Sequence, residues 1–136
     1  MEKDLQGKTS DPANNRFQYS YLSVSISSNV YLDFLEELRL DHSPDIFFNV
    51  VDKTKDSFQY QRKTLILESS KTKTIIYKKD LGLFTLREGK SIDFSPFTNF
   101  DSISLSNTFL NLVFGFTLYQ RNVDVLHTSA IEINNK

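Results

Sequence analysis

Leu83-Phe84-Thr85-Leu86 and Ser91-Ile92-Asp93-Phe94 flank a polar stretch, Arg87-Glu88-Gly89-Lys90. Apolar and polar side chains alternate along both flanks, which is the period-2 pattern of a half-buried β-strand. The central stretch contains Gly89, a residue that tolerates the left-handed backbone of a tight turn. The sequence therefore predicts a β-hairpin over 83–94, ended by Pro96, and a fold in which antiparallel strands dominate.

Further strands are predicted by short runs rich in β-branched and aromatic residues. The stretch from Phe17 to Ser27 alternates in two phases that change at Tyr21-Leu22, which predicts one strand with a bulge. The other runs on the N-terminal side of the hairpin are 46–51, 65–67 and 74–77. A last strand is predicted over Val123–Ile133, where the sequence runs into the turn residues Asn134-Asn135. No returning strand follows in the sequence, so we expect this strand to be an open edge that promotes self-association.

Two helices are predicted from apolar residues at helical spacing. The longer one covers 100–119, with Asp101 or Ser102 as its N-cap and Asn122 as its end. Its expected apolar stripe consists of Leu105, Phe109, Leu112, Val113, Phe116 and Tyr119. A shorter helix is predicted over 31–40 from the spacing of Leu32, Leu35 and Leu38.

These elements predict the α+β class: a mostly antiparallel sheet, one long C-terminal helix, a shorter helix near 31–40 and a final strand. The chain of 136 residues is long enough for one domain with a core and short for two. Residues 1–15 show no apolar period, so we expect a disordered lead followed by a single domain over 16–136.

Composition excludes several function classes. Sixteen Lys and Arg oppose seventeen Asp and Glu, and a net charge of −1 gives no electrostatic footprint for nucleic acid or an anionic membrane. The sequence has no Cys, which excludes a disulfide framework, a thiolate nucleophile and a Cys-ligated zinc site. It contains neither a signal peptide nor an apolar run of membrane-spanning length. We therefore expect a cytoplasmic protein.

Gly89-Lys90-Ser91 copies the end of a phosphate-binding P-loop. A P-loop has four residues between its glycines, whereas six residues separate Gly82 from Gly89 here. Such a loop must also lead into a helix whose N-terminus holds phosphate, and Gly89 is flanked by predicted strands. A hairpin turn is the better interpretation, and no nucleotide site is predicted in this stretch.

Basic residues gather between the predicted strands of the middle region, at Arg62, Lys63, Lys71, Lys73, Lys78 and Lys79. They could form a basic docking patch. Because Glu68 and Asp80 dilute this charge, we favour a solvated strand edge on which lysines prevent aggregation.

His127 is one of two histidines, and their separation fits no metal-ligand spacing. On an extended strand His127 shares a face with Val125, Ser129 and Ile131, and its neighbour Asp124 points the other way. From the residues alone, His127 is predicted to be a structural residue on a half-buried strand.

Three segments resemble HPr-kinase-like proteins and follow one another in the order of that family. They are the hairpin Leu81–Ile92, the helix 105–119 and the strand Leu126-His127-Thr128-Ser129-Ala130, whose approach from Gln120 is also similar. The resemblance implies a bacterial, ATP-dependent kinase that phosphorylates a serine of a protein or peptide. It also implies a catalytic role for His127, close to the transferred phosphoryl group.

The family's P-loop and its Mg²⁺-binding residues follow this strand and have no counterpart in the sequence. Phosphoryl transfer depends on those groups, so we expect no cofactor in this chain, with ATP and Mg²⁺ bound only by a complete family member. Two hypotheses follow. The chain is a truncated kinase, or one that works with a separately encoded P-loop half, or it is a stand-alone binding or regulatory domain without catalysis.

Overall fold

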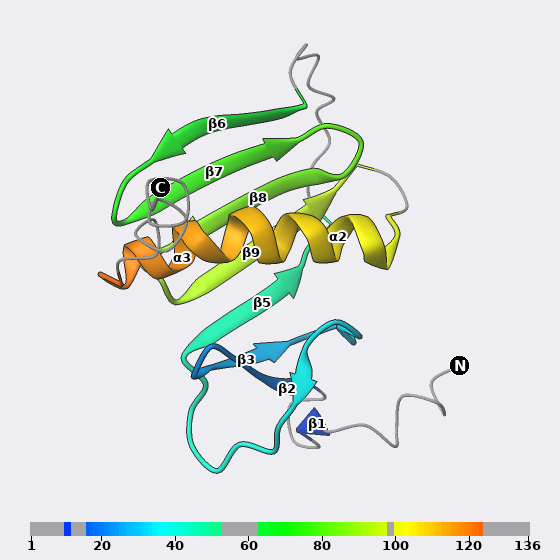
Figure 1. The fold of residues 1–136 in the computed structure, drawn as a ribbon, viewed down its shortest axis with the longest axis vertical. Coiled ribbons are helices and arrows are strands. Elements are labelled where there is room, and N and C mark those ends of the chain that lie inside the picture. Colours follow the sequence, from blue (N-terminus) through cyan, green and yellow to red (C-terminus); the bar gives the residue numbers. More distant parts are fainter. Residues whose placement is uncertain (1–9, 12–15, 53–62, 98–99, 124–136) are drawn as a thin grey trace, which may run out of the picture.

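The computed structural model describes residues 10–11, 16–52, 63–97 and 100–123. These residues form one mixed, mostly antiparallel sheet and one 19-residue helix, which lies across a single face of the sheet (Figure 1). The predicted α+β class is therefore confirmed. The strands are β1 (Ser10–Asp11), β2 (Arg16–Tyr21), β3 (Val24–Ser28), β4 (Glu36–Glu37), β5 (Ile46–Val50), β6 (Thr64–Ser69), β7 (Lys73–Lys78), β8 (Gly82–Arg87) and β9 (Ser91–Pro96).

The strand order is β1-β2-β3-β5-β9-β8-β7-β6, and β4 pairs with the outer edge of β2 beside β1. Strands β6 to β9 form an antiparallel meander, visible in the upper half of Figure 1. Strand β5 pairs in parallel with both β3 and β9. Strands β6 to β8 therefore lie in the connection between the neighbouring parallel strands β5 and β9.

The predicted hairpin is present as β8 and β9. Its turn is left-handed at Glu88 (φ 52) and Gly89 (φ 67). This backbone geometry matches the twist of a tight hairpin. Phe84 lies opposite Phe94, and their rings stack with centroids 4.5 Å apart. The alternation seen in the sequence thus places one face of the hairpin in the core.

The single bulged strand predicted over 17–27 is wrong. The phase change marks a two-residue hairpin turn between β2 and β3. Leu22 (φ 52) and Ser23 (φ 65) are both left-handed there, as the common two-residue hairpin turn requires. Because these positions hold Leu and Ser, the turn lacks the Gly or Asn by which such turns are predicted from sequence. Leu22 is exposed at the tip, as a turn residue must be.

The short helix predicted over 31–40 is also wrong. Leu32 and Leu35 are buried as their spacing suggested, but the chain makes one turn there and then runs into β4. The backbone N–H of Leu38 donates to the carbonyl of Gln18, and that of Leu40 donates to the side-chain oxygen of Gln18, both at 3.0 Å. The segment therefore pairs with the open edge of β2 and does not form helical hydrogen bonds, because a helix of this length is only marginally stable by itself.

The long helix runs from Ser102 to Gln120 as α2 (Ser102–Thr108), η1 (Phe109–Val113) and α3 (Phe114–Gln120). Asp101 is the N-cap, as predicted, and its carboxylate accepts from the N–H of Ser104 at 2.6 Å. Segment η1 is a π turn, in which the N–H of Phe114 donates to the carbonyl of Phe109.

The π turn changes which side chains of the helix are buried. One extra residue in the turn rotates α3 relative to α2. Phe114 and Leu118 therefore enter the core, whereas Phe116 is half-buried and Tyr119 is 39% exposed. The predicted apolar stripe is thus correct as far as Phe116, which packs against the core, and wrong at Tyr119.

The helix ends as predicted at Asn122, which is left-handed (φ 67). The N–H of Val123 donates to the carbonyl of Leu118 at 2.8 Å, and that of Asn122 donates to the carbonyl of Tyr119 at 3.0 Å. These two bonds form a Schellman motif, which satisfies carbonyls that the helix leaves open. The predicted strand over 123–133 lies outside the described residues except for Val123, as does most of the lead over 1–15.

The core lies between the helix and the sheet face that it covers. Leu105, Phe109 and Val113 of the helix meet apolar side chains that alternate along every central strand. The sheet residues in this core include Tyr19, Ile26, Ile46, Phe48, Ile76, Phe84, Leu86, Ile92 and Phe94. The opposite face of the sheet has no helix over it among the described residues.

Candidate functional site

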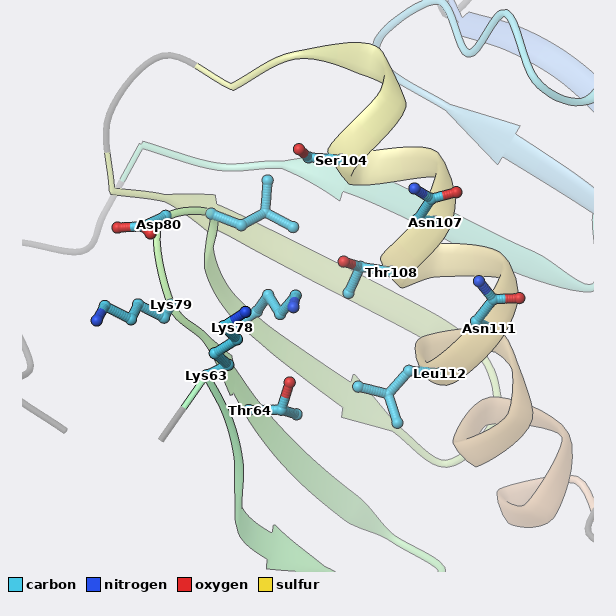
Figure 2. Close-up of a pocket in the computed structure, with 11 residues that line it drawn as sticks. Lys63, Thr64, Lys78, Lys79, Asp80, Ser104, Asn107, Thr108, Asn111 and Leu112 are labelled. Atoms are coloured by element: carbon cyan, nitrogen blue, oxygen red, sulfur yellow. The ribbon is translucent and has the colours of Figure 1, made fainter. Parts of the chain in front are cut away.

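A groove of about 540 Å³ lies between the first half of the helix and one end of the meander (Figure 2). Its helix side is lined by Ser104, Asn107, Thr108, Asn111 and Leu112. Its sheet side is lined by Lys63, Thr64, Lys78, Lys79, Asp80 and Leu81. We refer to these eleven residues as the lysine groove.

The helix side of the groove is a polar stripe. Ser104, Asn107 and Asn111 are exposed and recur at three- and four-residue steps, so they occupy one face of the helix. Thr108 is buried beneath them. The π turn begins directly after Thr108 and includes Asn111, and such turns are frequent at functional sites.

The sheet side of the groove is built by the start of β6 and the turn after β7. Thr64 lies opposite Lys78 in the ladder, and the N–H of Lys79 donates to the carbonyl of Lys63 at 2.7 Å. Lys78 lies on the same sheet face as the core residue Ile76, because the two are separated by one residue on a strand. Its half-buried side chain therefore points toward the helix side of the sheet.

The turn after β7 removes the nearest negative charge from this face. Asp80 is left-handed (φ 66), and the N–H of Leu81 donates to the carbonyl of Lys78 at 3.1 Å. Figure 2 shows the side chains of Lys79 and Asp80 directed away from the helix. Lys78 is therefore the half-buried lysine on the helix side of the groove, and Lys63 lines the groove as an exposed residue.

Within the described part of the chain, the side chains of Lys63, Lys78 and Lys79 form no salt bridge. A half-buried ammonium group loses hydration, and this loss is normally offset by a carboxylate or another acceptor. Hydroxyl and amide groups across the groove can accept or donate hydrogen bonds to a ligand. The arrangement is suited to a ligand that carries an anionic group.

The described residues contain no group of three or more His, Cys, Asp or Glu side chains that could hold a metal ion. In the groove itself Asp80 is the one carboxylate among the lining residues, and it points outward. The groove therefore offers cationic and neutral polar groups to a ligand. Such groups can bind an anion by direct contact, without a bridging metal ion.

The residues singled out from the sequence have different fates. His127 lies outside the described residues, so its predicted catalytic role stays a prediction. Gly89-Lys90-Ser91 forms the β8–β9 turn, as expected from its flanking strands. The N–H of Gly89 donates to the side chain of Gln120, so this turn anchors the end of the helix.

The predicted role of the lysines as guards of a strand edge is wrong for Lys73 and Lys78. Both belong to β7, which lies between β6 and β8 in the sheet. The outer strand β6 itself contains no lysine. The alternative interpretation, a basic docking patch, stays a prediction, and Lys63, Lys78 and Lys79 line one groove.

Sequence reasoning missed the polar stripe of the helix. Its signal was present as Ser104, Asn107 and Asn111 at helical spacing, on the side of the helix away from the predicted apolar stripe. Such a stripe is the ordinary solvated face of an amphipathic helix, so its spacing alone does not indicate a site. Only its position opposite the lysines distinguishes it.

A second polar cluster lies on the sheet face opposite the helix and is structural. The guanidinium of Arg16 donates to Ser27 Oγ at 2.6 Å and to Asn49 Oδ1 at 2.8 Å, and it lies over the ring of Phe47. Asn49 in turn donates to Asp93 at 3.2 Å. These side chains hold one another across β2, β3, β5 and β9 and leave little for a ligand.

None of the helices in the described residues combines the length and the apolar character that a membrane span needs. Comparison of the chain with known protein families, with curated proteins and with solved structures found no match in any of the three.

Proposed function

We propose that this chain is a binding domain that takes an anionic group of its ligand into the lysine groove. The observation that carries the proposal is the position of Lys63 and Lys78, which face the polar stripe of the helix without a carboxylate partner among the described residues. A phosphate or a carboxylate would offset the desolvation of Lys78 and accept hydrogen bonds from the groove.

Binding without catalysis is supported by the chemistry of the lining residues. Phosphoryl transfer needs a phosphate cradle, a bound metal and a residue that orients the nucleophile. The groove runs along the side of the helix, and the Asp101 cap engages a free N–H group of the first turn. The lining residues thus supply affinity and orientation for an anion, which are the properties of a recognition domain.

A second proposal rests on the resemblance to HPr-kinase-like proteins. In this view the chain is one part of a serine kinase and requires a P-loop half that binds ATP and Mg²⁺. His127 would then act beside the transferred phosphoryl group. Its test is phosphotransfer by the chain mixed with a P-loop half, where His127→Ala should abolish activity and leave the melting temperature nearly unchanged.

The anion site can be tested with pyrophosphate as the probe. We expect titration to shift the backbone amide signals of Lys78, Asp80 and Asn111 in two-dimensional NMR spectra, in a saturable and salt-sensitive manner. Lys78→Ala should weaken binding about 10- to 100-fold, since one charge-assisted contact is worth roughly 1.5–3 kcal/mol.

The matched control is Lys90→Ala. Lys90 is exposed at the β8–β9 turn, and its backbone bonds do not depend on its side chain. It should bind pyrophosphate like the unmodified protein. Equal loss of affinity in both variants, or shifts spread over the whole surface, would show that the chain attracts anions only by its general charge.

A further inference from the structure

Strand β6 is the last strand at its end of the sheet and pairs only with β7 among the described residues. Open strand edges present unpaired N–H and C=O groups to which another extended chain can add. Lysine and proline are common protections of such edges, and the sequence Thr-Leu-Ile-Leu-Glu-Ser of β6 contains neither.

The register shows which backbone groups of β6 point outward. The carbonyl of Lys63 accepts from Lys79, so this pair is hydrogen-bonded. Hydrogen-bonded and non-bonded pairs alternate along an antiparallel ladder, so Leu65 also bonds inward to its partner Tyr77. The N–H and C=O groups of Thr64 and Ile66 therefore point away from the sheet, toward the open edge.

The same strand exposes apolar side chains. Ile66 is 36% exposed and Leu67 is 38% exposed, and the register shifts at a bulge between Ile66 and Glu68. The bulge limits regular pairing to the first half of β6, from Thr64 to Ile66. This half also borders the lysine groove, since Thr64 lines it and lies opposite Lys78.

These observations place a backbone edge, an apolar contact and a cationic groove side by side. We propose that the occupant of this surface is an extended segment of a partner protein that pairs with β6 and directs a Glu or Asp side chain into the lysine groove. This inference rests on the function proposed for the groove, and adds the class of its ligand.

Charge complementarity favours this occupant over a second copy of the chain. A residue of the added strand that lies beside Thr64 shares a sheet face with Thr64 and Lys78, since side chains in register point to the same side. A carboxylate at that position would face Lys78. A second copy pairing through β6 would instead bring two sets of these lysines together. The one carboxylate of that strand, Glu68, lies beyond the bulge opposite Ile75, so it is on the other sheet face from Lys78.

The test uses three synthetic peptides and the full chain. The first alternates Val and Thr around two central Glu residues, the second replaces both Glu by Gln, and the third carries N-methyl groups on one edge of the Glu peptide. We expect the Glu peptide to bind in calorimetric titration. The affinity of the Gln peptide should be lower by a factor of about five or more, and that of the N-methylated peptide by a factor of about ten.

Ile66→Pro provides the matching variant of the protein. Its N–H points outward, so proline removes the edge donor without breaking the ladder to β7. This variant should lose binding of the Glu peptide and keep binding of pyrophosphate, whereas Lys78→Ala should lose both. Should Ile66→Pro lower the melting temperature strongly, the N-methylated peptide still tests strand addition on the unmodified protein.

The outcomes separate the two proposals. Pyrophosphate binding without Glu-peptide binding overturns the strand addition and leaves the anion site intact. Loss of both overturns both. The inference is also overturned if the Glu peptide binds with the same affinity as the N-methylated peptide or the Gln peptide. It is overturned as well if the protein forms a dimer through β6 without peptide, with the dimer detected by light scattering.

Discussion

The side-chain oxygen of Gln120 accepts a 2.8 Å hydrogen bond from the backbone N–H of Gly89. Gln120 is buried in the last turn of the helix, and its amide group donates at 3.1 Å to Thr74 Oγ1 and at 3.2 Å to the carbonyls of Leu86 and Ser70. One side chain thus connects the helix to the β6–β7 turn, to β7, to β8 and to the β8–β9 turn. It fixes the angle at which the helix crosses the meander and hence the position of the lysine groove.

Gln120→Leu should destabilise the fold strongly. Leucine fills similar space but leaves the Gly89 N–H without its buried partner, at about 1–3 kcal/mol, and it removes the bonds to Thr74, Leu86 and Ser70. We expect the free energy of unfolding to fall by about 3 kcal/mol in urea denaturation. Ile103→Ala, at a position 73% exposed on the same helix, should change it little. Equal effects of both substitutions would contradict the bridging role of Gln120.

Gly89→Ala tests the same junction from the side of the turn. Gly89 is left-handed, and a Cβ there would collide with the Arg121 side chain and lie 3.1 Å from the Arg121 backbone nitrogen. The backbone conformation alone costs about 1–2 kcal/mol for an L-residue, and the collision adds to it. Thermal unfolding followed by circular dichroism should show a lower midpoint for Gly89→Ala than for Lys90→Ala, the neighbouring turn variant. A midpoint equal to that of the unmodified protein would show that the helix end is not seated on the turn.

Local patterns were sufficient to predict the β8–β9 hairpin, the Asp101 cap and the Asn122 end, because each depends on residues close in sequence. The segment 31–40 differs, since burying Leu32 and Leu35 is compatible with either a helix or a pinned extended chain. Its hydrogen bonds to Gln18 decide between them, and a pattern within the segment does not contain that partner. The π turn at Phe109 is similarly invisible, because nothing in the local spacing requires an extra residue per turn.

The site was predictable only in part for the same reason. The lysines stand out in the sequence, but their meaning depends on β7 being an inner strand and on the helix crossing above Lys78. Both facts are set by the order of strands in the sheet. The family resemblance directed attention to His127, beyond the described residues, whereas the groove uses residues that no single motif unites.

Asp45 should make stability depend on pH. The backbone N–H of Ser25 lowers the pKa of Asp45 below its usual 3.8, and the Ser25 hydroxyl and the Arg121 guanidinium act in the same direction against partial burial. Because the folded pKa lies below the unfolded one, the ionised carboxylate stabilises the fold above about pH 5. This stabilisation is lost as the pH falls through the folded pKa.

Asp45→Asn should therefore melt at a lower temperature than the unmodified protein at about pH 7, and the gap should narrow as the pH falls below 3.8 through the folded pKa. Melting temperatures of both proteins across this range measure the effect directly. Asp41→Asn serves as the control, because the Asp41 side chain is 96% exposed. A gap that persists unchanged at low pH would assign the effect to lost packing and not to the charge of Asp45.

Lys78→Met should separate stability from binding. Methionine keeps most of the apolar stem of this half-buried residue and removes an ammonium group that has no carboxylate partner in the described residues. Without an anion we expect the variant to be more stable by about 0.5–2 kcal/mol, the range typical of relieving a strained functional position.

With pyrophosphate the unmodified protein should gain stability as the anion saturates its site, because the ligand binds only the folded state. The melting temperature of Lys78→Met should respond only at anion concentrations about tenfold higher or more, while Lys90→Met should respond like the unmodified chain. A variant that is less stable without anion would mean that Lys78 contributes to the fold through its own contacts, and the groove would then have no unsatisfied charge to offer a ligand.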